Sequence, residues 1–181
     1  MKIKIISAII VGTLASVSLF AHSKAIKPDY IDMLLKPYFE VQTGLSRDNL
    51  INTQKSAKKF KEMLGHGPSF EDAPSLSDLD LEIGNIIDAE NIEVARKAFH
   101  MLSLDLEEMI EHVGTTNRQN IFVMHCPMAF GGNGANWLQE SKKLANPYFG
   151  SKMYSCGSVQ TQLGEDKVEK LHNSHSHKHK F

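Results

Sequence analysis

Apolar residues recur every three to four positions through most of the first two-thirds of the chain, which is the spacing of amphipathic helices. The pattern predicts four helices, joined by short polar or proline-containing links. They cover residues 29–45 with a kink at Pro37, residues 46–64, residues 76–87 and residues 91–113. Helices of this length with short joints predict an antiparallel four-helix bundle.

Residue types at the ends of these segments support the boundaries. Ser46 is the expected N-cap of the second helix, with Asp48 in its first turn, where the helix dipole favours an anion. Asn91 is the expected cap of the fourth helix, and Gly114 is its expected end.

The pattern changes after Gly114. Residues 120–125 form a short, partly β-branched apolar run that favours a strand. Three glycines at 131, 132 and 134 indicate a turn-rich loop, and residues 153–163 suit a second short strand or an irregular return. The predicted fold class is therefore mainly α: an antiparallel four-helix bundle with a small irregular, short-strand C-terminal lobe.

The first 25 residues have the organisation of a secretory signal peptide. Lys2 and Lys4 precede an uncharged apolar stretch over residues 5–20, followed by Ser23 and Ala25 at the −3 and −1 positions of a cleavage site. The stretch is shorter than the roughly 20 residues that span a bilayer. We expect a product that is exported to the periplasm and is not embedded in the membrane. The chain then divides into a signal peptide (1–25), a helical metal-binding domain (26–164) and a flexible His-rich tail (165–181).

Composition narrows the class of protein. The 181 residues are 41% hydrophobic and 23% charged, as in an ordinary globular domain, and a net charge of −1 argues against a nucleic-acid binder. Acidic side chains crowd residues 71–112, where Arg96 and Lys97 are the only bases. The sequence has no nucleophile elbow, Walker loop, zinc-protease motif or Cys-x-x-Cys pair, so we do not expect an enzyme.

One constellation carries candidate chemistry, because both cysteines of the chain lie in short sulfur-rich segments after the helices. The first is Met124-His125-Cys126-Pro127-Met128, and the second is Met153-Tyr154-Ser155-Cys156-Gly157. Cys126 and Met128 would point to one side of an extended chain, and Met153 and Cys156 would meet across one helical or 3₁₀ turn. Thiolates and thioethers select Cu(I), and the imidazole of His125 also suits copper.

Two other interpretations remain open from residue types. Methionines commonly fill cores, and two cysteines in an exported protein commonly form a disulfide. Closing the loop between Cys126 and Cys156 would stabilise the fold by roughly 3–4 kcal/mol in the chain-entropy model. Residue types alone favour the disulfide over the metal site.

The C-terminal tail holds a second candidate metal site. Four histidines, interleaved with polar residues, suit Cu(II) or Zn(II) through neutral imidazoles. They are His172, His175, His177 and His179.

The order of motifs resembles a known family. The motifs are His125-Cys126-Pro127-Met128-Ala129, Gly134-Ala135-Asn136-Trp137-Leu138, Asn146-Pro147-Tyr148-Phe149-Gly150, Lys152-Met153 and Cys156-Gly157-Ser158-Val159, with residues 92–99 upstream. They resemble an exported helical domain of formally unassigned function. That domain occurs alone and also fused to the C-terminal end of membrane-fusion adaptors in copper/silver efflux systems. The resemblance spans residues 29–163.

The resemblance implies a role in periplasmic copper handling, with Cys126, Met128, Met153 and Cys156 as the ligands. His125 stands where many members have an aromatic residue, and the His-rich tail is an addition of this chain. With the resemblance, the metal site is favoured over the disulfide. We therefore expect a copper-binding protein that sequesters or delivers Cu(I), with a copper efflux or uptake component as its partner. The alternative is a disulfide-stapled helical interaction module with no metal at the cysteines.

Overall fold

The structure is a computed structural model, and it describes residues 25–116 and 118–164. The predicted signal peptide and the four tail histidines lie outside the described residues. In the described part of the chain, no helix combines the length and apolar character needed to cross a membrane.

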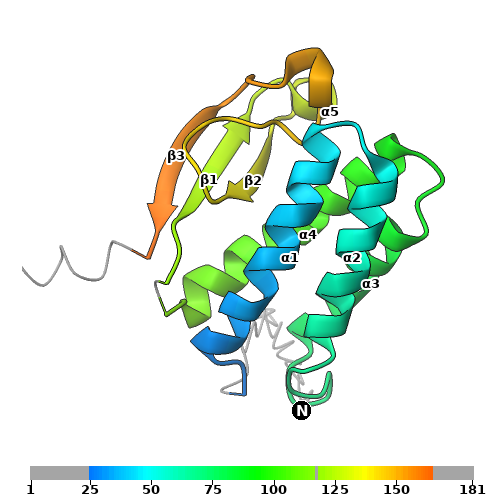
Figure 1. The fold of residues 1–181 in the computed structure, drawn as a ribbon. Helices are drawn as coiled ribbons and strands as arrows, with labels where there is room; N and C mark the ends of the chain where they lie inside the picture. Colours follow the sequence, from blue (N-terminus) through cyan, green and yellow to red (C-terminus); the bar gives the residue numbers. More distant parts are fainter. Residues whose placement is uncertain (1–24, 117, 165–181) are drawn as a thin grey trace, which may run out of the picture.

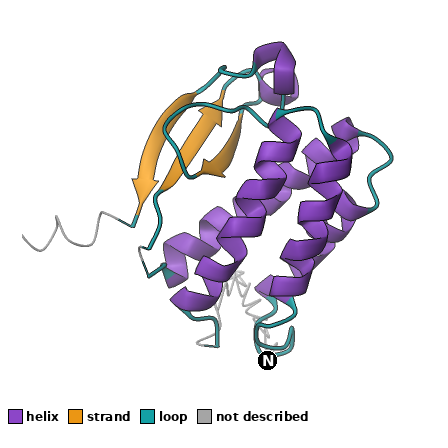
Figure 2. Ribbon diagram, in the orientation of Figure 1, coloured by secondary structure: helices purple, strands orange, loops and turns teal. Residues whose placement is uncertain are grey.

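Four helices pack in an antiparallel fashion and form most of the molecule (Figures 1 and 2). They are α1 (Pro28–Ser46), α2 (Leu50–Leu64), α3 (Ser75–Ile87) and α4 (Ile92–Val113). Each contributes one apolar face to a continuous core, as the helical spacing predicts. The fully buried side chains of this core include Leu34, Leu35, Tyr38, Phe60, Leu79, Ile83, Phe99 and Leu102. The predicted bundle is confirmed.

The link between α1 and α2 differs from the prediction. Ser46 is the last residue of α1, and its hydroxyl donates to the carbonyl of Thr43 within that helix, at 2.9 Å. The chain turns at Asp48, which has a left-handed φ of 54°, and Asn49 caps α2 by accepting from the Asn52 amide at 2.9 Å. Asp48 is thus outside the first turn of α2 and free to make the contacts described below.

The ends of α4 are as predicted. The Asn91 side chain accepts from the Val94 amide at 3.0 Å. Gly114 follows the last helical residue with a φ of 85°, a conformation that glycine adopts without strain.

After α4 the chain forms a three-stranded antiparallel sheet of order β2-β1-β3. The strands are β1 (Ile121–Cys126), β2 (Ala135–Gln139) and β3 (Ser158–Leu163). A single turn, α5 (Ala129–Gly132), lies in the predicted glycine loop, and a 3₁₀ turn, η1 (Gly150–Met153), precedes β3. The expected strand over residues 120–125 is confirmed, and the 153–163 segment becomes a strand from Ser158 onward.

The sheet lies beside the bundle, with β2 next to α1 and α4 and β3 outermost (Figure 1). A buried polar contact fixes this arrangement. The Tyr38 hydroxyl of α1 lies 2.7 Å from the Ser103 hydroxyl of α4 and accepts from the Leu138 amide of β2 at 3.0 Å. Burial raises the pKa of Tyr38 well above its usual value, so this hydroxyl keeps its proton and remains a donor.

The close approach of α1 and α2 gives a stability test. A Cβ added at Gly44 would lie 2.5 Å from the Thr53 Oγ1 and 2.9 Å from its amide nitrogen, whereas nothing lies within 4 Å of one added at Gly84 in α3. Gly44→Ala should lower the free energy of unfolding by about 1–3 kcal/mol, because the helices must move apart. The control Gly84→Ala should raise it by up to about 1 kcal/mol through helix propensity. Urea denaturation measures both, and equal stability of the two variants would contradict this packing.

Candidate metal centre

The structure brings the two cysteines together. Cys126 is the last residue of β1 and is fully buried, and Cys156 is partly buried in the bend before β3. Their Sγ atoms are 3.8 Å apart, and both thiols are free. The pairing of β1 with β3 explains this, because His125 lies opposite Ser158 and the cysteines follow and precede that pair.

The sulfur separation matches two ligands on one ion. For metal–sulfur bonds of about 2.3 Å at the tetrahedral angle, two thiolate sulfurs on one ion lie about 3.8 Å apart. A disulfide would require the sulfurs to approach to about 2.05 Å. The 3.8 Å separation, which is also that of two thiols in hydrogen-bonding contact, is compatible with a shared ion and leaves about 1.8 Å to close for a disulfide.

Met153 belongs to the same corner of the fold. It is the last residue of η1 and is partly buried, and its carbonyl accepts from the Cys156 amide at 3.0 Å. The predicted single turn between Met153 and Cys156 is therefore present.

Met128 does not follow the geometry expected for it. The chain leaves the extended conformation after Cys126, and Met128 has helical dihedrals, φ −90° and ψ −9°, as the cap of α5. Its side chain is 55% exposed. The expectation that Cys126 and Met128 share one side of a strand is wrong, because β1 ends between them.

His125 and Cys126 are neighbours in β1, so their side chains leave the strand on opposite faces. The Nδ1 of His125 lies 2.8 Å from the Asn136 Oδ1 of β2, and the Asn136 amide reaches Glu107 of α4 at 3.4 Å. Burial raises the pKa of Glu107. The structure thus places His125 in a polar contact between the sheet and α4, and not beside the two sulfurs.

No cluster of three or more His, Cys, Asp or Glu side chains suited to hold a metal occurs within residues 25–116 and 118–164. Any metal held at the cysteine pair needs thioethers or molecules from outside the chain as further ligands. A hollow of about 610 Å³ lies between α1 and α2 and is lined by polar and charged side chains such as Lys36, Arg47 and Lys55. None of its lining residues belongs to the sulfur segments.

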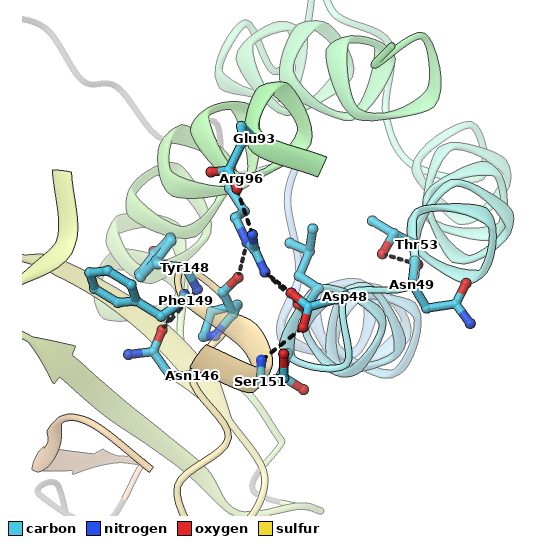
Figure 3. Close-up of polar contacts among 12 residues, drawn as sticks. Asp48, Asn49, Thr53, Glu93, Arg96, Asn146, Tyr148, Phe149 and Ser151 are labelled. Atoms are coloured by element: carbon cyan, nitrogen blue, oxygen red, sulfur yellow. Dashed lines mark hydrogen bonds and ion pairs between the residues drawn. The ribbon is translucent and has the colours of Figure 1, made fainter. Parts of the chain in front are cut away.

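Asn146 fixes the loop that carries Cys156. Its side chain is fully buried and donates to the Cys156 carbonyl at 2.8 Å. It accepts from the Tyr148 and Phe149 amides at 2.8 and 3.1 Å (Figure 3). The loop also passes close to β1 at Gly157, where an added Cβ would lie 2.6 Å from the His125 carbonyl oxygen. The Asn146 side chain therefore ties the position of Cys156 to the turn that follows Pro147.

Arg96 of α4 attaches the same loop to the bundle. Its guanidinium, 4% exposed, donates to the Pro147 carbonyl at 2.8 Å and to Asp48 Oδ1 at 2.6 Å (Figure 3). The second oxygen of Asp48 accepts from the Ser151 amide at 2.8 Å. Hydrogen bonds from Ser151 and the charge and hydrogen bond of Arg96 lower the pKa of Asp48 to about 2. This Arg96–Asp48 clamp joins α4, the α1–α2 link and the loop before Cys156.

The Cys156 thiol gives up its proton less readily than an ordinary cysteine thiol. Partial burial and the neighbouring Cys126 thiol raise the pKa of Cys156. Because a metal binds the thiolate, metal binding at this pair must release the thiol proton and weakens as the pH falls.

Comparison with known proteins supplies one match. Residues 34–118 match the family described as "Protein of unknown function (DUF3347)". The matched segment includes all of α2, α3 and α4 and most of α1, with Arg96 and Asp48, and it ends before β1. Neither a curated protein nor a solved structure gave a significant match.

The clamp gives a pH-dependent stability prediction. Because its folded pKa of about 2 is below the usual value of 3.8, Asp48 contributes stability above pH 3.8 that is lost as the pH falls toward 2. Asp48→Asn should lower the free energy of unfolding at pH 7, and the deficit should shrink between pH 4 and pH 2. The control Asp80→Asn removes an exposed ion pair with Lys61 and should change stability by less than about 0.5 kcal/mol. Denaturation at each pH measures the difference, and a deficit independent of pH would contradict the clamp.

The role of Asn146 is tested by thiol reactivity. Asn146→Ala removes the three hydrogen bonds of this buried side chain and should let the 146–157 loop open. Cys126 should then react at least about tenfold faster with a thiol reagent under native conditions. Asn85→Ala, which removes one exposed side-chain contact to Glu82, is the matched control. Unchanged labelling rates in Asn146→Ala would show that other contacts hold the loop.

Proposed function

We propose that this protein binds copper as Cu(I) between Cys126 and Cys156 and sequesters or delivers it in the periplasm, as part of copper homeostasis or resistance. The observation that carries the proposal is the 3.8 Å separation of the two free thiol sulfurs. Two thiolates at this distance bridge to one soft ion without a large rearrangement of the loop.

The remaining ligands come from methionine. Met153 is one turn before Cys156, and its thioether supplies a third soft donor. Met128, which is exposed two residues after Cys126, supplies a fourth donor when the loop after β1 folds over the ion. A set of two thiolates and two thioethers favours Cu(I) over the hard cations, and Ag(I) is the nearest competitor in ligand preference.

The two cysteines differ in solvent exposure, and this difference suits the capture and release of copper. Cys126 is fully buried at the end of the central strand, whereas Cys156 is partly exposed in a bend. An ion from solution binds first to the partly exposed Cys156 and then also to the buried Cys126. A partner that accepts the ion approaches from the same side, and a copper efflux or uptake component fits this role, in line with the resemblance of the sulfur motifs.

The tail histidines are the second copper-binding part of the proposal. His172, His175, His177 and His179 are expected to gather Cu(II) or Zn(II) at the end of the chain. Transfer of copper to the sulfur pair then requires reduction to Cu(I). The proposal is of a binding protein, not an enzyme.

A Cu(I) competition titration tests the site. Fully reduced protein should take one Cu(I) from a competing chelator. Cys126→Ser or Cys156→Ser should each weaken binding by at least about 100-fold, because each removes one of the two thiolate ligands. Met153→Leu should weaken it by about tenfold. The control Met101→Leu alters a methionine that is 44% exposed on α4 and should leave the affinity unchanged.

Two outcomes would contradict the proposal. Binding that survives in the double variant Cys126→Ser/Cys156→Ser would place the copper elsewhere, with the tail histidines as the first place to look. Reduced protein that takes up no Cu(I), together with cysteines that are paired when the protein is purified without reductant, would favour the disulfide-stapled interaction module.

A further inference from the structure

We infer that Cys126 and Cys156 form a reversible disulfide, and that an external thiol or disulfide exchanges with the pair only at the sulfur of Cys156. The partner this fits is a thiol–disulfide oxidoreductase or a small thiol. Exchange depends only on the two cysteines, whereas its consequence for metal binding rests on the proposed function.

The first support is the short distance that the two sulfurs must close. The sulfurs, 3.8 Å apart, must approach by about 1.8 Å to bond. Cys126 is held in the central strand, which pairs with a strand on each side. Cys156 lies in a bend after two exposed residues, Tyr154 and Ser155, and before the outermost strand. Rotation of the partly exposed Cys156 side chain therefore supplies the movement, and β1 stays in place.

The second support is the difference in exposure. Exchange requires a thiolate to approach a disulfide sulfur along the sulfur–sulfur axis. Cys126 is 0% exposed, so an external thiolate does not reach it. Cys156 is partly exposed, so the incoming sulfur bonds to Cys156 and the Cys126 sulfur leaves.

The exchange balances without a further reactant. In oxidation, the Cys156 thiolate attacks an external disulfide, forms a mixed disulfide and expels one external thiolate. The Cys126 thiolate then attacks the Cys156 sulfur and expels the second external thiolate, so the pair loses two electrons and two protons and the external disulfide is reduced to two thiols. Reduction by an external dithiol follows the same steps in reverse, with Cys126 as the leaving thiolate.

Disulfide formation removes the thiolate ligands of the proposed metal site. A disulfide occupies both thiolates, so the oxidised pair has no anionic ligand for Cu(I). In an oxidising compartment the site then binds copper only after reduction, and the reductant acts at Cys156.

The test uses metal-free full-length protein with a chelator present and oxidised glutathione as the probe. Wild type should lose two mass units and keep no adduct, because Cys126 resolves the mixed disulfide. Cys126→Ser should accumulate a glutathione adduct on Cys156. Cys156→Ser should form its adduct at least about tenfold more slowly while folded and at a normal rate in urea, which shows that Cys126 is intact but shielded. Cys126→Ala serves where serine disturbs the buried position.

Three results would overturn the inference. They are a wild type that retains a glutathione adduct, a wild type whose two thiols stay reduced, and a folded Cys156→Ser that reacts as fast as Cys126→Ser. Because no copper is present, these results are independent of Cu(I) affinity. Copper uptake by reduced protein, measured separately, distinguishes failure of the exchange from failure of the proposed function.

Discussion

A single buried guanidinium connects the parts of this molecule that lie far apart in sequence. Arg96 extends from α4 into a position where its donors meet the Asp48 carboxylate, the Pro147 carbonyl and the end of α1. An arginine that is almost fully buried is stable only with such partners, so its burial requires the α1–α2 link and the loop before Cys156 to be in place together. Gly150 is part of the same requirement, because a Cβ there would collide with the Asp48 side chain. The helical bundle thereby positions the loop before Cys156.

A series of hydrogen bonds leads from the Arg96–Asp48 clamp to the two cysteines. The clamp holds the backbone at Pro147 and Ser151, and Asn146 carries the constraint to the Cys156 carbonyl. On the other side, Tyr38 and Ser103 hold β2 against the helices, and β2 holds β1 with Cys126 at its end. Each cysteine is therefore positioned through a separate set of hydrogen bonds that begins in the helices. Two sulfurs far apart in sequence meet because both sets converge where β1 ends and β3 begins.

The sequence pattern was sufficient for the bundle, and for the end of α4, because apolar spacing and capping residues act locally. It placed the wrong cap on α2, since Ser46 is the last residue of α1 and Asp48 binds the tertiary partners Arg96 and Ser151. The meeting of the two cysteines was anticipated from their motifs, but the separation of Met128 and of His125 from them depends on where β1 ends and which face each residue takes. Arg96 had one local signal, a rare base in an acidic stretch, and Asn146 had none beyond the motif that contains it.

The position of β3 at the rim of the sheet has a kinetic consequence. This strand is hydrogen-bonded to β1 alone, and its first four side chains are exposed, so little apolar surface is lost when it detaches. Fluctuations of the rim strand can therefore uncover the end of β1 that carries Cys126 while the helices stay folded. The rate at which solvent molecules reach the buried sulfur is then set by local fraying at the edge of the sheet and not by the global stability of the fold.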